Sequence, residues 1–103
     1  MSPRKHDHGI SLDLAKQLVQ NHHRSAPAGG ERCGYFARAA FDEILAQPGC
    51  AGIRFYHGRD ANGTPTLLFI GVTEEKLDML DGPIVENHYP CPPDCTGSTL
   101  GAG

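Results

Sequence analysis

The sequence has no long apolar run and no excess of basic residues. Its 103 residues carry a formal net charge of −3, whereas generic nucleic-acid binders are normally basic. The same charge gives the chain no electrostatic attraction to an anionic membrane surface. No apolar run approaches the ~20 residues that a membrane helix needs. We therefore expect neither nucleic acid nor a membrane among the partners.

An export signal is also lacking. Residues 1–9 are polar, and no apolar segment follows their basic pair, as a secretory signal peptide would require. The sequence therefore predicts a cytoplasmic location by default. Extracellular release by a non-classical route is an alternative that the sequence leaves open.

Hydrophobic residues are scarce as well. They make up 39% of the chain, and thirteen glycines and eight prolines account for much of the shortfall. Such a composition predicts long irregular stretches, and the length suits one domain. We expect a flexible N-terminal arm over residues 1–10, an α+β domain over residues 11–90 and a tail rich in Cys, Pro and Gly over residues 91–103.

The first half of the chain predicts two amphipathic helices. Ser11 is a good N-cap, and from Leu12 to His23 the apolar residues recur on one side of a helix. After a break rich in Ala, Gly and Pro, a second helix is predicted over about residues 31–47. Cys33 lies on its apolar stripe, and Pro48-Gly49 ends it.

The second half changes to a period of two, which predicts strands. Residues 52–58 alternate in polarity, and residues 66–73 are apolar on both faces. Residues 74–83 are ambiguous in sequence. Residues 74–80 could form a short helix that residues 81–83 would end, and residues 84–86 could form a short third strand. The expected fold class is α+β, with two amphipathic helices packed on a small antiparallel β-sheet in ααββ order and an irregular Cys/Pro-rich C-terminal tail.

The stretch from Tyr35 to Cys95 resembles a group of short uncharacterised bacterial proteins with a Cys-Pro-Pro-x-Cys tail. The matching features are the helix Phe41-Asp42-Glu43-Ile44-Leu45 with Gln47-Pro48-Gly49-Cys50, the strands over residues 52–56 and 67–72, and the tail motif Cys91-Pro92-Pro93-Asp94-Cys95. The resemblance covers more than half of the chain. It implies no activity, because no chemistry is assigned to that group.

The four cysteines, Cys33, Cys50, Cys91 and Cys95, are all disulfide candidates. Two prolines fix much of the backbone between Cys91 and Cys95, which favours a disulfide if their Cα atoms come within about 7 Å. The same two thiols together with His88 are candidate metal ligands, with zinc as the candidate cofactor. Free thiols are the third interpretation. Cys33 is predicted to be a buried thiol, and Cys50 lies in a turn.

The strand over residues 66–73 suggests what the protein does. Two helices cannot cover both faces of so small a sheet, so Leu68, Ile70 and Val72 are predicted to self-associate. The leading hypothesis is a non-catalytic self-associating structural or interaction protein, a homo-oligomer or filament subunit stapled by cysteines.

Two alternatives from other classes stay open at this point. One is a metal-binding or thiol-redox module centred on Cys91 and Cys95. The other is a small Cys/His enzyme, for which the sequence supplies suitable residue types but assigns no catalytic residue.

Overall fold

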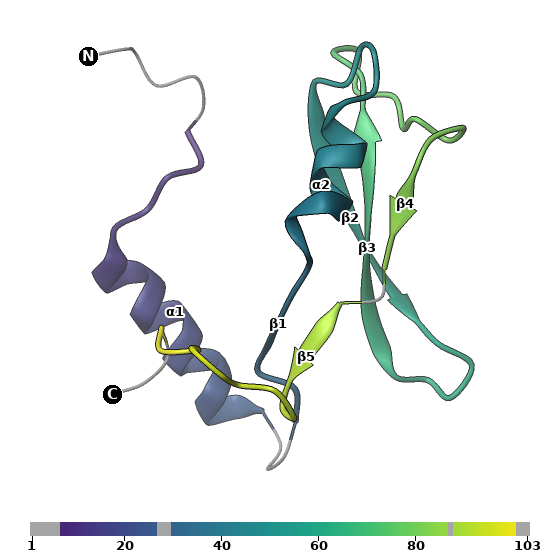
Figure 1. Cartoon of the computed structure of the whole chain (residues 1–103). Coiled ribbons are helices and arrows are strands. Elements are labelled where there is room, and N and C mark those ends of the chain that lie inside the picture. The colour runs from purple at the N-terminus through teal and green to yellow at the C-terminus, as the bar shows by residue number, and fades with distance from the viewer. Residues whose placement is uncertain (1–6, 27–29, 87, 101–103) are drawn as a thin grey trace. The chain divides into compact units, whose positions relative to one another are not determined.

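The computed structural model describes residues 7–26, 30–86 and 88–100. In chain order the elements are α1 (Leu12–Ser25), β1 (Cys33–Tyr35), α2 (Arg38–Leu45), β2 (Gly52–Arg59), β3 (Pro65–Val72), β4 (Ile84–Val85) and β5 (Tyr89–Cys91) (Figure 1). Within these residues, two helices and two small sheets confirm the predicted α+β class. Neither helix has the length and apolar character needed to cross a membrane.

The chain divides into two compact units. One runs from Tyr35 to Tyr89, and the other joins Met1–Gly34 to Pro90–Gly103. The helix α1 falls in the same unit as the C-terminal tail, and the expected domain over residues 11–90 stays a prediction. The expected arm over residues 1–10 lies mostly outside the described residues, and positions 7–10 have no helix or strand.

The helix α1 is built by local signals that the sequence shows. Ser11 Oγ accepts a hydrogen bond from the Leu14 N–H at 3.1 Å, so the predicted N-cap is confirmed. The first turn carries Asp13, and the last turn carries basic residues, an arrangement that suits the helix dipole. The predicted helix over residues 12–23 therefore exists, but none of its residues is buried.

The second predicted helix, over residues 31–47, is wrong in its first part. Cys33–Tyr35 forms β1, which pairs with β5 in a two-stranded sheet. Gly34 inside a helix would cost about 1 kcal/mol relative to Ala, whereas the strand pairing satisfies the backbone. Close to this pair, the Arg32 N–H donates to the Cys91 carbonyl at 2.6 Å. Only Arg38–Leu45 is helical.

The larger sheet has the strand order β2-β3-β4 and is antiparallel throughout. The register opposes Phe55 to Phe69 on β2 and β3. The helix α2 lies against these two strands (Figure 1), where the ring of Phe41 is 5.3 Å from that of Phe69. Ile44 of α2 is fully buried, so it anchors the helix to the sheet.

A glycine permits the close approach of α2 to β3. A Cβ atom on Gly71 would lie 3.2 Å from Ile44 Cγ2 and 2.8 Å from Gln47 Nε2. An alanine at position 71 would therefore require the flexible end of the Gln47 side chain to move and the Ile44 methyl group to give way slightly.

Residues 73–81 form an irregular segment and not the short helix that was one interpretation of residues 74–80. The Leu77 N–H donates to Thr73 Oγ1 at 3.2 Å, and the Met79 N–H donates to the Gly71 carbonyl at 2.9 Å. Asp78 forms an isolated β-bridge with Val72. The Leu77 bond closes a turn within the segment, and the Met79 bond and the Asp78 bridge join the segment to β3. The predicted third strand is confirmed as β4.

Candidate functional site

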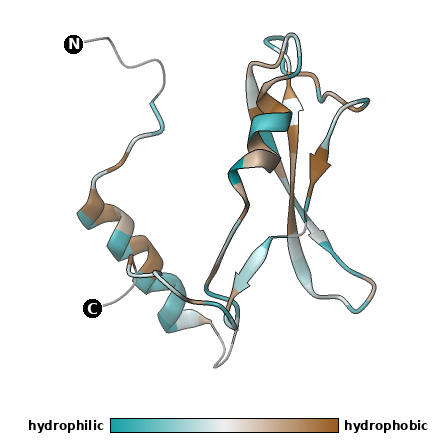
Figure 2. Cartoon of the chain, in the orientation of Figure 1, coloured by the Kyte–Doolittle hydropathy of each residue, from teal (hydrophilic) through white to brown (hydrophobic). Residues whose placement is uncertain are grey.

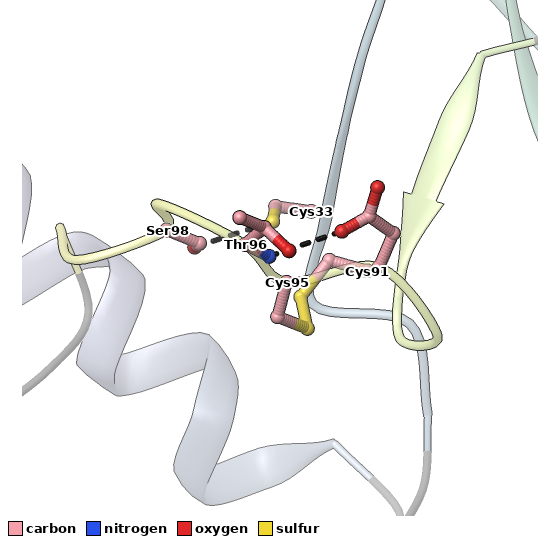
Figure 3. The surroundings of a disulfide bond; sticks show 6 residues. Cys33, Cys91, Cys95, Thr96 and Ser98 are labelled. Carbon is pink, nitrogen blue, oxygen red and sulfur yellow. Dashed lines mark hydrogen bonds between the residues drawn. A yellow bond between two sulfur atoms is a disulfide. The ribbon is translucent and has the colours of Figure 1, made fainter.

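The tail motif forms a closed covalent loop. Cys91 and Cys95 are joined by a disulfide, with their Cα atoms 4.8 Å apart (Figure 3). The peptide bonds Cys91–Pro92 and Pro92–Pro93 are both cis. Cys91 is 3% exposed, whereas Cys95 is exposed to solvent. The predicted pairing of closely spaced tail cysteines is thus present in the structure, and its two sulfur-bearing residues differ sharply in their access to solvent.

Backbone and side-chain bonds order the chain around this disulfide. The Asp94 N–H donates to the Pro90 carbonyl at 3.2 Å, and Asp94 Oδ1 accepts from the Thr96 N–H at 3.1 Å (Figure 3). Hydrogen bonds from the Thr96 side chain and backbone lower the pKa of the Asp94 carboxyl below its usual value. The loop is therefore a set of local turns and not an unstructured tail.

Cys33 lies in the same unit as the disulfide. Its thiol is free and exposed, and its Sγ is 3.6 Å from Ser98 Oγ (Figure 3). The prediction that Cys33 is a buried helical thiol is wrong, because residues 33–35 pair as a strand. The two-stranded sheet brings Cys33 on β1 beside the strand that carries Cys91. Sequence spacing gave no sign of this neighbourhood.

Cys50 belongs to the other unit. Its thiol is free and half-buried, and it donates to the Gly52 carbonyl at 3.3 Å. It also approaches the position that a Cβ on Gly71 would occupy. Cys50 therefore fills space at the end of α2, as a small buried hydrophobe does.

The metal prediction named His88 with Cys91 and Cys95. In the structure the two sulfurs are bonded to each other, and the His88 ring lies 5.8 Å from the ring of Phe36. Across residues 7–26, 30–86 and 88–100, no three His, Cys, Asp or Glu side chains are grouped closely enough to hold an ion. The zinc site stays a prediction for the reduced protein.

The predicted self-association face is partly covered by the chain itself. Ile70 is only 5% exposed, and Leu68 and Val72 are half-buried. Ile70 lies between Arg54 and Ile84 in the sheet register, so its two cross-strand neighbours flank it on this face. Little of Ile70 is left for a partner to contact.

A polar cluster on the same face was not anticipated. Arg54 Nη1 donates to Asp78 Oδ1 at 2.6 Å, forming a salt bridge, and the Tyr56 hydroxyl donates to Asp78 Oδ2. Hydrogen bonds with Tyr56 and Asp78 raise the pKa of Arg54 above its usual value. The signal available in the sequence was the i, i+2 spacing of Arg54 and Tyr56, which places both on one face of β2.

The largest difference from expectation is the apolar stripe of α1. Leu12, Leu14 and Leu18 are 61%, 45% and 52% exposed, and Ile10 just before the helix is 56% exposed. Figure 2 shows hydrophobic positions alternating with hydrophilic ones along α1. Within the unit that contains α1, none of the described residues buries this stripe. An amphipathic pattern marks a face that is suited to burial, but it does not say what covers that face.

The described residues also form an open surface hollow of about 290 Å³. Gly49, Cys50, Ala51, Glu74 and Glu75 line it. Ligand pockets are typically enclosed and mostly apolar, whereas this one presents two exposed carboxylates and offers no convergent set of groups.

Comparison with known proteins does not add a function to this geometry. The resemblance of residues 35–95 to short bacterial proteins with a Cys-Pro-Pro-x-Cys tail stays an expectation. No protein-family model matches the chain, and no curated protein and no solved structure matches it either.

Proposed function

We propose that the protein is a non-catalytic, self-associating structural or interaction subunit that pairs with a second copy of itself through the apolar stripe of α1. One observation carries the proposal. The helix is regular and capped at its N-terminus, yet none of its residues is buried and its leucines are exposed.

The free energy of an isolated helix supports the need for a partner. Helices of fewer than about 12–15 residues are marginal in water, and packing of an apolar face supplies most helix stability in proteins. The 14 residues of α1 fall at that limit. Fully burying one leucine side chain contributes about 1.5–3 kcal/mol. Covering Leu14 and Leu18, which are one turn apart on the same side, would therefore stabilise both the helix and the complex.

The charges of α1 favour a second copy as the partner. Asp13 lies in the first turn, and His22, His23 and Arg24 lie in the last. Two copies packed antiparallel bring the acidic turn of one helix beside the basic turn of the other, with opposed helix dipoles. The contact is the same patch on both copies, so it closes as a two-fold dimer. A filament would need a further surface.

The proposal replaces the sheet with α1 as the main contact. Leu68 and Val72 on β3 remain the candidate second surface from the sequence. The alternative of a metal-binding or thiol-redox module stays a proposal at Cys91 and Cys95. Their disulfide favours thiol chemistry there over metal binding, because the thiolate is the form that binds a metal. The third alternative, a small Cys/His enzyme, gains no support from the arrangement.

Sedimentation velocity of the full chain across the micromolar range tests the proposal. The wild type should dissociate from dimer to monomer on dilution, and Leu18→Glu should be monomeric throughout. Gln17→Glu adds the same charge on the polar face and should still dimerise. Circular dichroism should show helix in both variants, because Glu is a good helix former.

The outcomes separate the possible surfaces. A wild type that stays monomeric at all concentrations would contradict self-association altogether. Equal weakening by Leu18→Glu and Gln17→Glu would contradict the role of the stripe. If Leu68→Glu abolished the dimer and Leu18→Glu did not, the contact would lie on the sheet and not on α1. A reducing agent should leave the dimer intact, because no cysteine lies in α1.

A further inference from the structure

We propose that Cys33 is the internal exchange partner of the Cys91–Cys95 disulfide, so that these three cysteines form one thiol–disulfide exchange unit. The observation that carries this inference is separate from the exposed stripe of α1. A free, exposed thiol and a disulfide lie in one compact unit, and the strands β1 and β5 that bear Cys33 and Cys91 are paired.

Two contacts hold Cys33 close to the disulfide loop. The hydrogen bond from the Arg32 N–H to the Cys91 carbonyl fixes the residue before Cys33 against Cys91 at 2.6 Å. On the other side, Cys33 Sγ contacts Ser98 Oγ at 3.6 Å, three residues beyond Cys95. Figure 3 shows Cys33, Cys91, Cys95 and Ser98 around the same short stretch of chain.

The reaction is a thiol–disulfide exchange that needs no external oxidant. The Cys33 thiolate attacks Cys91 Sγ, the Cys33–Cys91 bond forms and the Cys91–Cys95 bond breaks, and Cys95 leaves as a thiolate that takes a proton from water. One disulfide and one thiol are present before and after. The proton released by Cys33 equals the one that Cys95 takes up.

Exposure decides which sulfur is attacked. Cys95 is exposed and Cys91 is 3% exposed, so a thiol in solution reaches Cys95, whereas Cys33 lies on the strand that pairs with the one carrying Cys91. Departure of Cys95 also places the new thiolate in water, where its charge is solvated, and not in the buried position.

The exchange changes which part of the chain the disulfide closes into a loop. The Cys91–Cys95 bond closes only the short tail loop, whereas a Cys33–Cys91 bond closes a loop that contains residues 34–90 and hence the whole sheet unit. A disulfide that closes a longer loop restricts the unfolded chain more. The exchanged form should therefore unfold at a higher urea concentration than the native isomer.

Peptide mapping without reduction tests the proposal in the full-length Cys50→Ser protein, which removes the fourth thiol. The protein is equilibrated at mildly alkaline pH with a trace of reduced glutathione, quenched with acid and alkylated. Trypsin then releases residues 33–38 and 77–103 as separate peptides. We expect part of the material to contain these two peptides joined by a disulfide, with Cys95 alkylated. Cleavage before Asp94 separates Cys91 from Cys95 and identifies the attacked sulfur.

Two variants serve as controls. Cys33→Ser in the same background should keep the native disulfide under all these conditions. Cys50→Ser/Cys95→Ser, oxidised with glutathione disulfide, should form an intramolecular Cys33–Cys91 bond with loss of Cys33 alkylation. The proposal is overturned if Cys33 stays fully alkylatable in the Cys50→Ser protein. It is overturned equally if the double variant yields only intermolecular dimers or glutathione adducts.

Discussion

The two helices of this protein differ in their capping and in how many of their side chains are buried. The longer one, α1, has a side-chain cap and complementary charges at its ends, but it buries none of its residues. The shorter one, α2, has eight residues and no side-chain cap, yet it contains the fully buried Ile44. Local signals therefore specify where α1 begins and ends, whereas packing against the sheet stabilises α2. Both sequences are amphipathic, so amphipathicity alone does not distinguish a covered face from an exposed one.

The largest expected effect is at the core of α2. Ile44→Ala should lower the free energy of unfolding by about 2–5 kcal/mol, because it removes buried methyl groups and leaves a cavity. Leu45→Ala, at a neighbouring position that is 52% exposed, should cost less than about 0.5 kcal/mol. Urea denaturation followed by circular dichroism measures both. Equal losses in the two variants would mean that packing does not maintain α2.

A smaller loss of stability is expected in the irregular segment over residues 73–81. Asp78→Asn weakens the acceptor shared by Arg54 and Tyr56 and should cost about 1 kcal/mol. Amide exchange at Met79, whose N–H bonds to Gly71, should accelerate in parallel. Asp81→Asn, at an exposed position nearby, is the matched control. Unchanged exchange at Met79 in Asp78→Asn would show that the cluster does not hold this segment.

The cap of α1 should give a smaller and local effect. Ser11→Ala removes the acceptor for the Leu14 N–H, which typically costs about 1 kcal/mol of helix stability. The change is best made in the Leu18→Glu background, so that dimer formation does not mask it. Backbone chemical shifts of α1 should move toward coil values while those of α2 stay constant. Fully preserved shifts in α1 would mean that something besides local signals maintains it.

The smallest effect concerns the pKa of Asp94. Hydrogen bonds from Thr96 lower this pKa from its usual 3.8, so a carboxyl titration followed by nuclear magnetic resonance should have its midpoint below pH 3.8. The folded pKa is depressed, and the contribution is therefore present above the unfolded value and lost as the pH falls through the folded one. Thr96→Val keeps the backbone bond and should raise the midpoint only part of the way. A midpoint that does not move would assign the whole shift to the backbone.

The sequence predicted the elements whose signals are local and continuous. Ser11 and the stripe after it specify α1, the alternation over residues 52–58 specifies β2, and the apolar run over residues 66–73 specifies β3. The prediction was wrong where a long-range partner competed with local propensity. Residues 33–35 pair with β5, and residues 73–81 bond to β3.

In the candidate site, too, local sequence predicted one feature and long-range pairing decided another. The close spacing and two prolines of the tail motif predicted a bond between Cys91 and Cys95, since little chain entropy is lost when they join. The place of Cys33 beside that bond depends on a strand pair formed by residues far apart in sequence. No local pattern contains that information.

Composition and periodicity by themselves indicated the α+β class, the two helical centres and the two long strands, and the spacing of the tail cysteines favoured a disulfide between them. Only the tertiary structure decided which apolar faces are covered. Burial depends on every neighbour at once, so Ile70 is buried within its own unit, whereas none of the described residues in the other unit buries Leu14 or Leu18. Burial also decides which surface is left for a partner, and this is why the proposed contact moves from the sheet to α1.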